Sequence, residues 1–198
     1  MSESEIANTF FPLTERKRPR EETPASEDLA DAILVERAKS GKRGAFDELY
    51  ARFIPLVNGI VLSRVPHPDS EDVVQEVFIS AFKSIGSLRD ENAIGPWLAR
   101  IARNGAAEYF RRRRPTEELL NDIARQPVPT NDALAALEAI TSLPDAYSET
   151  LTLRLVEGMT GPEIAALTGM KETSVRVNLH RGMKMLRKKL GGKRGKSK

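Results

Sequence analysis

Cysteine is absent from this chain of 198 residues, which excludes disulfide bonds, thiolate catalysis and zinc sites built on cysteine. Histidine is scarce: His67 lies between two prolines and His180 in a basic segment, so no acid/base constellation is visible. No stretch approaches the roughly 18 consecutive apolar residues of a membrane span, and no period-two run predicts a strand. We therefore expect an all-α, cytoplasmic protein that is not an enzyme and has no contact with membranes.

Positive charge is concentrated in two short blocks, although the formal net charge of the chain is only +3. Residues 170–198 carry 11 basic side chains and one acid, and residues 100–114 carry six arginines and one acid. Two cationic blocks on an otherwise acidic body suggest two separate contacts with a polyanion, and nucleic acid is the obvious candidate. A solvated helix end and a flexible basic tail would give the same pattern, so charge alone leaves both interpretations open.

The spacing of apolar residues divides the chain into two small helical domains. Residues 1–27 mix Ser, Thr, Pro and charge without any apolar period, which predicts a disordered extension. Residues 28–114 show helical spacing in four segments, and residues 132–190 show it in a second unit. Between them, residues 115–131 have the composition of a flexible linker, with room for one helical turn, and residues 191–198 form a basic tail.

Local signals predict where the helices of the first domain bend, begin and end. Pro55 lies inside the second apolar segment and should kink that helix. Asp69 or Ser70 can cap the third helix, because each follows a break at two prolines. Pro115 disfavours continuation of the fourth helix beyond residue 114.

The second domain contains a pattern typical of a helix-turn-helix. Thr160 and Glu163 fit a capping box that opens a helix of about two turns. A small residue (Ala165), a turn glycine (Gly169) and a β-branched anchor (Val175) follow at the offsets expected of this motif. An ordinary helical hairpin is the alternative.

The last predicted helix divides into a core face and an exposed face. Its apolar residues are spaced three or four apart and should be buried: Val175, Leu179, Met183, Leu186 and Leu190. Near its N-terminus, residues of base-reading and phosphate-binding types should be exposed: Thr173, Ser174, Arg176, Val177, Asn178 and Arg181. We therefore expect this helix to enter the major groove of DNA.

Three motifs occur in one order along the chain: residues 70–78 (SEDVVQEVF), 97–104 (WLARIARN) and 163–181. Together they resemble the bacterial RNA polymerase sigma factors of the extracytoplasmic-function type, the short class that keeps only the second and fourth conserved regions. The resemblance covers about residues 28–190. It implies a subunit that binds core RNA polymerase and directs promoter-specific initiation, with no catalytic residue, cofactor, metal or small-molecule substrate. Many relatives are held by an anti-sigma factor, so such a partner belongs among those to test.

The resemblance also implies which face binds the polymerase. The polar face made by Asp72, Gln75 and Glu76 matches the segment that contacts the clamp coiled coil of the largest polymerase subunit. Carboxylates suit basic groups on a protein partner and do not suit DNA. Alternatively, these residues are only the solvated side of a bundle helix.

The loop 87–96 and the helix 97–114 match the part of a sigma factor that recognises and opens the minus-ten element. The resemblance makes Asn92 the candidate for contacting a flipped base, although the loop 90–95 is atypical of the family. The other candidates for contacting this DNA are Arg100, Arg103, Asn104, Arg111 and Arg112. Trp97 is expected to be structural.

The last helix matches the part that reads the minus-thirty-five element. Where relatives commonly show Lys-Ser-Arg, this chain has Arg176-Val177-Asn178, and Lys171 stands where a capping Ser is usual. We therefore expect an unusual target sequence. A different class, an independent helix-turn-helix regulator with a sensing or dimerising N-terminal domain, stays open, but it leaves the polar face and the arginine block unexplained.

Overall fold

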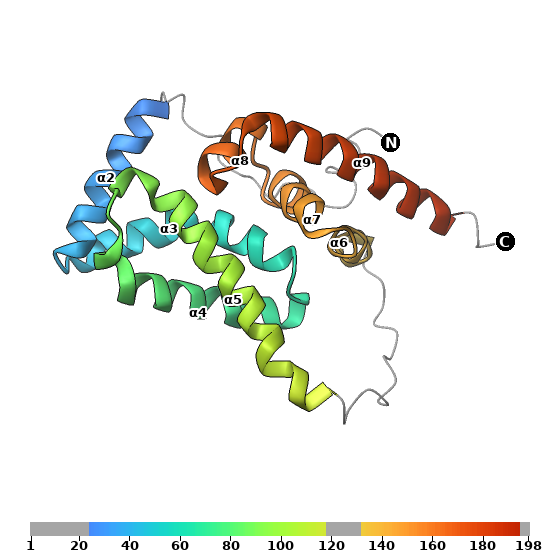
Figure 1. Ribbon diagram of the computed structural model, residues 1–198, viewed down its shortest axis with the longest axis horizontal. Coiled ribbons are helices and arrows are strands. Elements are labelled where there is room, and N and C mark those ends of the chain that lie inside the picture. Colours follow the sequence, from blue (N-terminus) through green and yellow to red (C-terminus); the bar gives the residue numbers. More distant parts are fainter. Residues whose placement is uncertain (1–23, 118–131, 195–198) are drawn as a thin grey trace.

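The computed structural model describes residues 24–117 and 132–194, and every regular element in those ranges is helical. Figure 1 shows the first helices, coloured blue to yellow-green, gathered into one N-terminal bundle. Its elements are α2 (Pro24–Lys39), α3 (Arg43–Leu62), α4 (His67–Ser84), 3₁₀ turns at Ile85–Ser87 and Glu91–Ala93, and α5 (Ile94–Glu117). None of the described helices is long and apolar enough to cross a bilayer.

The core of the N-terminal bundle is centred on α3, which contacts each of the other helices of the bundle. Its apolar residues recur every three or four positions, so they share one face and are removed from solvent together. The residues that α3 buries almost completely are Leu49, Phe53, Leu56 and Ile60. Phe78 and Phe82 of α4 pack against Tyr50 and Phe46 of α3, with ring centroids 4.6 and 4.9 Å apart, which fixes α4 against α3.

The remaining helices form a C-terminal unit, coloured yellow to red in Figure 1. They are α6 (Asp132–Thr141), α7 (Asp145–Leu151) continued by a π-helical turn (Thr152–Val156), α8 (Gly161–Thr168) and α9 (Glu172–Arg194). Ile140, Leu151 and Leu186 are fully buried in its own core. The π-helical turn was not predicted, and α9 runs past residue 190 into the predicted basic tail.

The predicted helix-turn-helix is confirmed in its local geometry. The backbone N–H of Thr160 donates to the Glu163 carboxylate (2.6 Å), and the N–H of Glu163 donates to the Thr160 hydroxyl (3.4 Å). Gly169 ends α8 with φ of 73°, a left-handed conformation that glycine adopts without steric cost. Val175 is buried at the start of α9, as the motif requires.

The predicted cap of α4 is wrong. Neither Asp69 nor Ser70 caps α4, because Pro66 occupies the N-cap position and the helix begins with His67. Pro68 suits this first turn, where a missing N–H leaves no hydrogen bond unmade. Asp69 instead accepts a hydrogen bond from the Tyr109 hydroxyl at 2.7 Å, so its carboxylate ties α4 to α5.

The ends of two helices also differ from prediction. α2 begins at Pro24, so residues 24–27 are helical although the sequence favoured disorder. α5 begins at Ile94 and continues to Glu117, so Pro115 lies inside its last turn. α3 runs through Pro55 without interruption, and the kink expected there stays a prediction. The rest of the predicted linker, with its helical turn, lies outside the described residues.

The bundle and the C-terminal unit share one apolar core. Leu153, Ile164 and Val175 of the C-terminal unit belong to the same buried cluster as the core of the bundle. Gly59 of α3 marks the closest approach, because a Cβ at that position would lie only 2.6 Å from a methyl carbon of Leu153. The sequence predicted two domains and a linker but gave no sign that the domains pack together.

Removal of the cap at Thr160 should destabilise the C-terminal unit. Thr160→Ala loses the hydroxyl that accepts from the Glu163 N–H, a change that costs about 1 kcal/mol in typical helices. The measurement is the midpoint of urea unfolding. Thr173→Ala, at an exposed position of α9, is the matched control and should leave the midpoint unchanged; equal midpoints for both variants would contradict the role of the cap.

Candidate functional site: an acidic docking face and two cationic surfaces

α4 presents the predicted polar face to solvent. Its apolar side is buried against the bundle, so Asp72, Gln75 and Glu76 are exposed together, one turn apart. Ile79 continues this face by one more turn and is 53% exposed, which is unusual for a large aliphatic side chain. The face therefore combines carboxylates with an exposed apolar group.

A groove of about 420 Å³ lies beside this face, between α3 and α4. Tyr50 and Ile54 line it from α3, and Val74 and Gln75 line it from α4. Tyr50 is itself 38% exposed. A concave strip with apolar walls next to carboxylates can accept a protein side chain, whereas a duplex of DNA would meet repulsive charge there.

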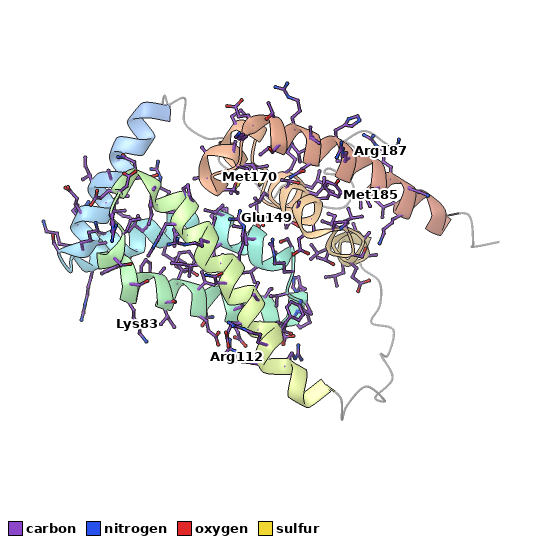
Figure 2. All side chains as sticks on the ribbon, in the orientation of Figure 1. Lys83, Arg112, Glu149, Met170, Met185 and Arg187 are labelled. Atoms are coloured by element: carbon purple, nitrogen blue, oxygen red, sulfur yellow. The ribbon has the colours of Figure 1, made fainter. Side chains whose placement is uncertain are left out.

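Glu76 on α4 and Arg112 on α5 form an ion pair, with 2.5 Å between Oε2 and Nη2. The hydrogen bonds and charge of Arg112 lower the pKa of the Glu76 carboxyl, and Glu76 in turn raises the pKa of Arg112. Figure 2 shows Arg112 on α5, on the side of the bundle where α4 lies. A predicted polymerase contact and a predicted DNA contact are thus direct partners.

The loop that carries Asn92 is held from two sides. Asp90 accepts hydrogen bonds from the backbone N–H of Asn92 (3.1 Å) and from its side-chain amide (3.3 Å), which leaves Asn92 exposed with its orientation restricted. From α2, the Lys39 ammonium donates to the Leu88 carbonyl and to the Glu91 carboxylate, both at 2.6 Å. The hydrogen bond from Lys39 to Glu91, together with the backbone hydrogen bond of Glu91, lowers the pKa of Glu91.

α5 places most of its predicted DNA contacts on the surface. Arg100, Asn104, Arg111 and Arg112 are exposed. Arg111 pairs with Glu108 one turn earlier on the same helix. Phe110 is 45% exposed among these cationic residues, so α5 offers an aromatic face as well as charge. Trp97 is partly buried against the core, in agreement with its predicted structural role.

Arg103, the remaining predicted contact on α5, forms a salt bridge with a carboxylate of the C-terminal unit. Glu149 of α7 accepts from Arg103 at 2.7 and 3.1 Å and from Arg64, which follows α3, at 2.7 Å. We call these three residues the Glu149 triad. Figure 2 shows Glu149 where the two units meet, and the residue is only 3% exposed.

Burial by itself would raise the pKa of Glu149, but the hydrogen bonds and charges of Arg103 and Arg64 outweigh it and leave that pKa below its ordinary value. A carboxyl whose pKa is depressed in the folded state stabilises that state above its ordinary pKa. The stabilisation is lost as the pH falls through the depressed value. The Glu149 carboxylate is therefore ionised at neutral pH.

The first turns of α9 carry the second cationic surface. Thr173, Ser174, Arg176, Val177 and Arg181 are exposed, and Asn178 is half-buried. Val177 is 44% exposed, which suits contact with a thymine methyl group. Where a capping serine was expected, the Lys171 backbone carbonyl accepts from the N–H groups of Ser174 and Val175, as in an ordinary helical start.

The sequence alone did not predict the parts played by Lys39, Arg64, Glu149, Ile79 and Phe110. Three of these residues, Lys39, Arg64 and Glu149, bond to residues that are distant in the chain. No local sequence pattern predicts such pairs. The exposed positions of Ile79 and Phe110 could have been predicted from the sequence. Ile79 lies seven positions after Asp72, on the helix face already predicted to be polar, and Phe110 directly precedes the arginine block.

Comparison with known proteins places this arrangement in one class. The model of "Sigma-70 region 2" matches residues 49–116, and the model of "Sigma-70, region 4" matches residues 133–186. The first match covers most of the bundle, and the second covers nearly all of the C-terminal unit. The class defined by this fold is thus that of the sigma-70 factors.

Relatives of similar length make the assignment more particular. The chain is 34% identical over 184 residues to the ECF RNA polymerase sigma-E factor of Haemophilus influenzae, covering 83% of this chain and 97% of the relative. It is 32% identical to that of Escherichia coli K12, with 83% and 96% covered. The structure of CnrH in complex with the cytosolic domain of CnrY is similar at a TM-score of 0.60 and 27% identity, covering 82% and 98%.

The chain therefore belongs to the ECF RNA polymerase sigma factors. It directs promoter-specific transcription, and the family acts in initiation without being catalytic. The resemblance inferred from the three motifs is thereby confirmed, as is the all-α fold with two helical regions.

Loss of the Lys39 ammonium should loosen the loop that carries Asn92. Lys39→Met removes the hydrogen bonds to Leu88 and Glu91, so backbone amides in residues 88–93 should exchange with deuterium faster. Lys42→Met, an equal loss of charge at an exposed position nearby, is the control and should leave the loop protected. Unchanged exchange in Lys39→Met would show that Lys39 does not restrain the loop.

Proposed function

We propose that this protein docks on core RNA polymerase through the exposed face of α4 and engages promoter DNA through α5 and α9. The observation that carries this proposal is that the two kinds of surface lie on different helices, which meet only at the edge marked by the Glu76–Arg112 ion pair. The acidic and apolar face lies on α4, whereas the exposed arginines and polar groups lie on α5 and on the first turns of α9. A protein partner and a polyanion can therefore be bound at the same time.

The α4 face suits a protein partner with basic groups. Asp72 and Glu76 supply the charge, Gln75 supplies a hydrogen-bonding amide, and Ile79 supplies apolar area that is favourable only against another protein surface. The resemblance to sigma factors makes the clamp coiled coil of the largest polymerase subunit the partner. The groove beside Gln75 would receive side chains of that coiled coil.

α5 and its preceding loop suit the minus-ten element in its opened form. A flipped base would contact Asn92, while Arg100, Arg103, Asn104, Arg111 and Arg112 would hold the backbone of the separated strand. Phe110 adds a ring on which an unstacked base can lie. Unstacking costs on the order of a few kcal/mol, which these contacts can offset without hydrolysis by the sigma factor.

α9 suits duplex DNA at the minus-thirty-five element. Arg176 can bond a guanine, Asn178 an adenine, and Val177 can contact a thymine methyl in the major groove. Thr173, Ser174 and Arg181 would contribute base or phosphate contacts. Tethering both DNA surfaces to one polymerase raises their effective concentration, so neither needs high affinity alone.

The remaining parts of the proposal concern partners and place of action. The similar protein CnrH is described in complex with the cytosolic domain of CnrY, which supports testing an anti-sigma partner for this chain. We place the protein in the bacterial cytoplasm with the polymerase. We assign it no catalytic activity, cofactor, membrane contact or small-molecule substrate.

Charge reversal on α4 tests the proposed function as a whole. Wild-type protein with core polymerase should give run-off transcripts from a subset of fragmented genomic DNA, whereas an independent regulator would give none. The double variant Asp72→Arg, Glu76→Arg should lose both the transcripts and the stable complex with core, because like charges would then meet at the contact. Its circular dichroism should be unchanged, since both residues are exposed.

Glu36→Lys, at an exposed position of α2, is the control for a change in net charge and should still bind core. Unchanged binding by the double variant would remove α4 from the interface.

Arg176→Ala tests whether α9 reads bases. If Arg176 bonds a base edge, the variant should lose about 1 to 3 kcal/mol of discrimination at one position of the upstream element. Lys188→Ala, at an exposed position further along α9, should weaken binding equally for all sequences. The measurement is binding of holoenzyme to a set of single-base promoter variants; a uniform loss in Arg176→Ala would reduce its role to phosphate contact.

A further inference from the structure

We propose that Lys39 of α2 is a positioning residue for base recognition: it holds the connection between α4 and α5 in the conformation in which Asn92 discriminates between bases of the opened strand. The inference rests on the proposed function, because it takes Asn92 as the residue that contacts a flipped base. It goes further by giving α2, which carries none of the predicted DNA contacts, a part in determining which base is accepted.

The connection between α4 and α5 is anchored at both ends in the core of the bundle. Ile85 and Leu88 are buried before its exposed stretch, and Ile94 is buried after it. Between these anchors, the side chains of residues 89–93 are exposed or half-buried. In Figure 1 this green connection lies beside α2. The restraint on the exposed stretch therefore comes mainly from polar contacts.

One ammonium group makes two of these polar contacts. The Nζ atom of Lys39 lies 2.6 Å from the Leu88 carbonyl oxygen and 2.6 Å from Oε1 of Glu91. The side chains of Lys39 and Glu91 are 24% and 30% exposed, so the pair is partly shielded from water. Lys39 ends α2 and directly follows Ala38, which is buried in the core of the bundle. The exposed stretch is thus tied to a rigid part of the fold.

Both acids that precede Asn92 are used within the chain. Unpaired carboxylates on a surface that meets DNA would repel its phosphates. Asp90 accepts from the backbone N–H and from the side-chain amide of Asn92, and Glu91 accepts from Lys39. One acid therefore orients the Asn92 amide, and the other ties the same turn to α2.

The Asn92 amide keeps the groups that a base needs. A primary amide has one acceptor oxygen and two N–H donors. One N–H of Asn92 is directed at Asp90, so the oxygen and the second N–H are left for a base edge. A wrong base leaves one of these groups unmatched, but it is rejected only if the amide cannot turn to follow it. A turn fixed by Asp90 and Lys39 meets this condition.

Loss of the ammonium should affect the preferred base alone. When the turn is mobile, the preferred base must order Asn92 before it can bond to it, and ordering one side chain costs about 2- to 10-fold in affinity. The other three bases do not bond to Asn92 and lose nothing. A contact between Lys39 and a phosphate, or general damage to the bundle, would instead weaken binding of all four bases equally.

The experiment measures base preference directly. Holoenzyme is assembled from the full chain and core polymerase and is bound to promoter fragments whose minus-ten element is already unpaired. Each position of that element carries each of the four bases in turn. Asn92→Ala should abolish the preference at one position, which identifies the base that Asn92 contacts. Lys39→Met should lower the preference at that same position by about 2- to 10-fold, through weaker binding of the preferred base only.

Two variants serve as controls. Lys42→Met removes an equal charge at an exposed position nearby and should keep the full preference. Lys39→Arg retains the positive charge and the N–H donors, so it should retain most of the preference. Thermal unfolding of each variant measures any loss of stability, which by itself would not change the ratio between bases.

The outcomes separate this inference from the proposed function. If wild-type holoenzyme never initiates, the proposed function fails and the positioning role fails with it. If Asn92→Ala keeps every preference, the base contact at Asn92 is wrong, and so is its positioning by Lys39. If Asn92→Ala loses one preference while Lys39→Met keeps it, or weakens all four bases equally, Lys39 does not position Asn92 and the proposed function stands.

Discussion

A single buried carboxylate organises the relation between the two halves of this protein. Glu149 belongs to the unit that carries the helix-turn-helix, yet both of its cationic partners belong to the bundle. An acid that is 3% exposed is stable there only because each oxygen is bonded to a guanidinium. This pairing helps to hold the C-terminal unit against the bundle, where α8 contacts the start of α5 and Arg103 is half-buried.

The sequence predicted the features that depend on local chemistry. The spacing of Val175, Met183 and Leu186 placed the buried face of α9, and Thr160 with Glu163 placed the start of α8. Three motifs in one order were enough to indicate the family. Within each helix and each motif, the residues that carry the signal lie within a few turns of one another, so periodicity and capping rules apply.

Features that depend on contacts between distant residues were not predictable. The residue type and position of Asp69 predicted a helix cap, but its carboxylate accepts a hydrogen bond from Tyr109, forty residues later in the chain. No sequence pattern predicted that Lys39 bonds to Glu91 in the following loop, or that Glu149 forms a salt bridge with Arg64. Charge patterning showed which residues attract DNA, but not which of them are already paired.

The ion pair between Glu76 and Arg112 joins two surfaces that were derived separately. A protein partner that draws the carboxylate into its own salt bridge leaves the guanidinium without a counter-charge. The positive charge of Arg112 would then be available to a phosphate, while the carboxylate of Glu76 is neutralised by the partner. Binding of the protein partner first and of DNA second would therefore be favoured electrostatically, because loss of the ion pair frees the Arg112 guanidinium for a phosphate.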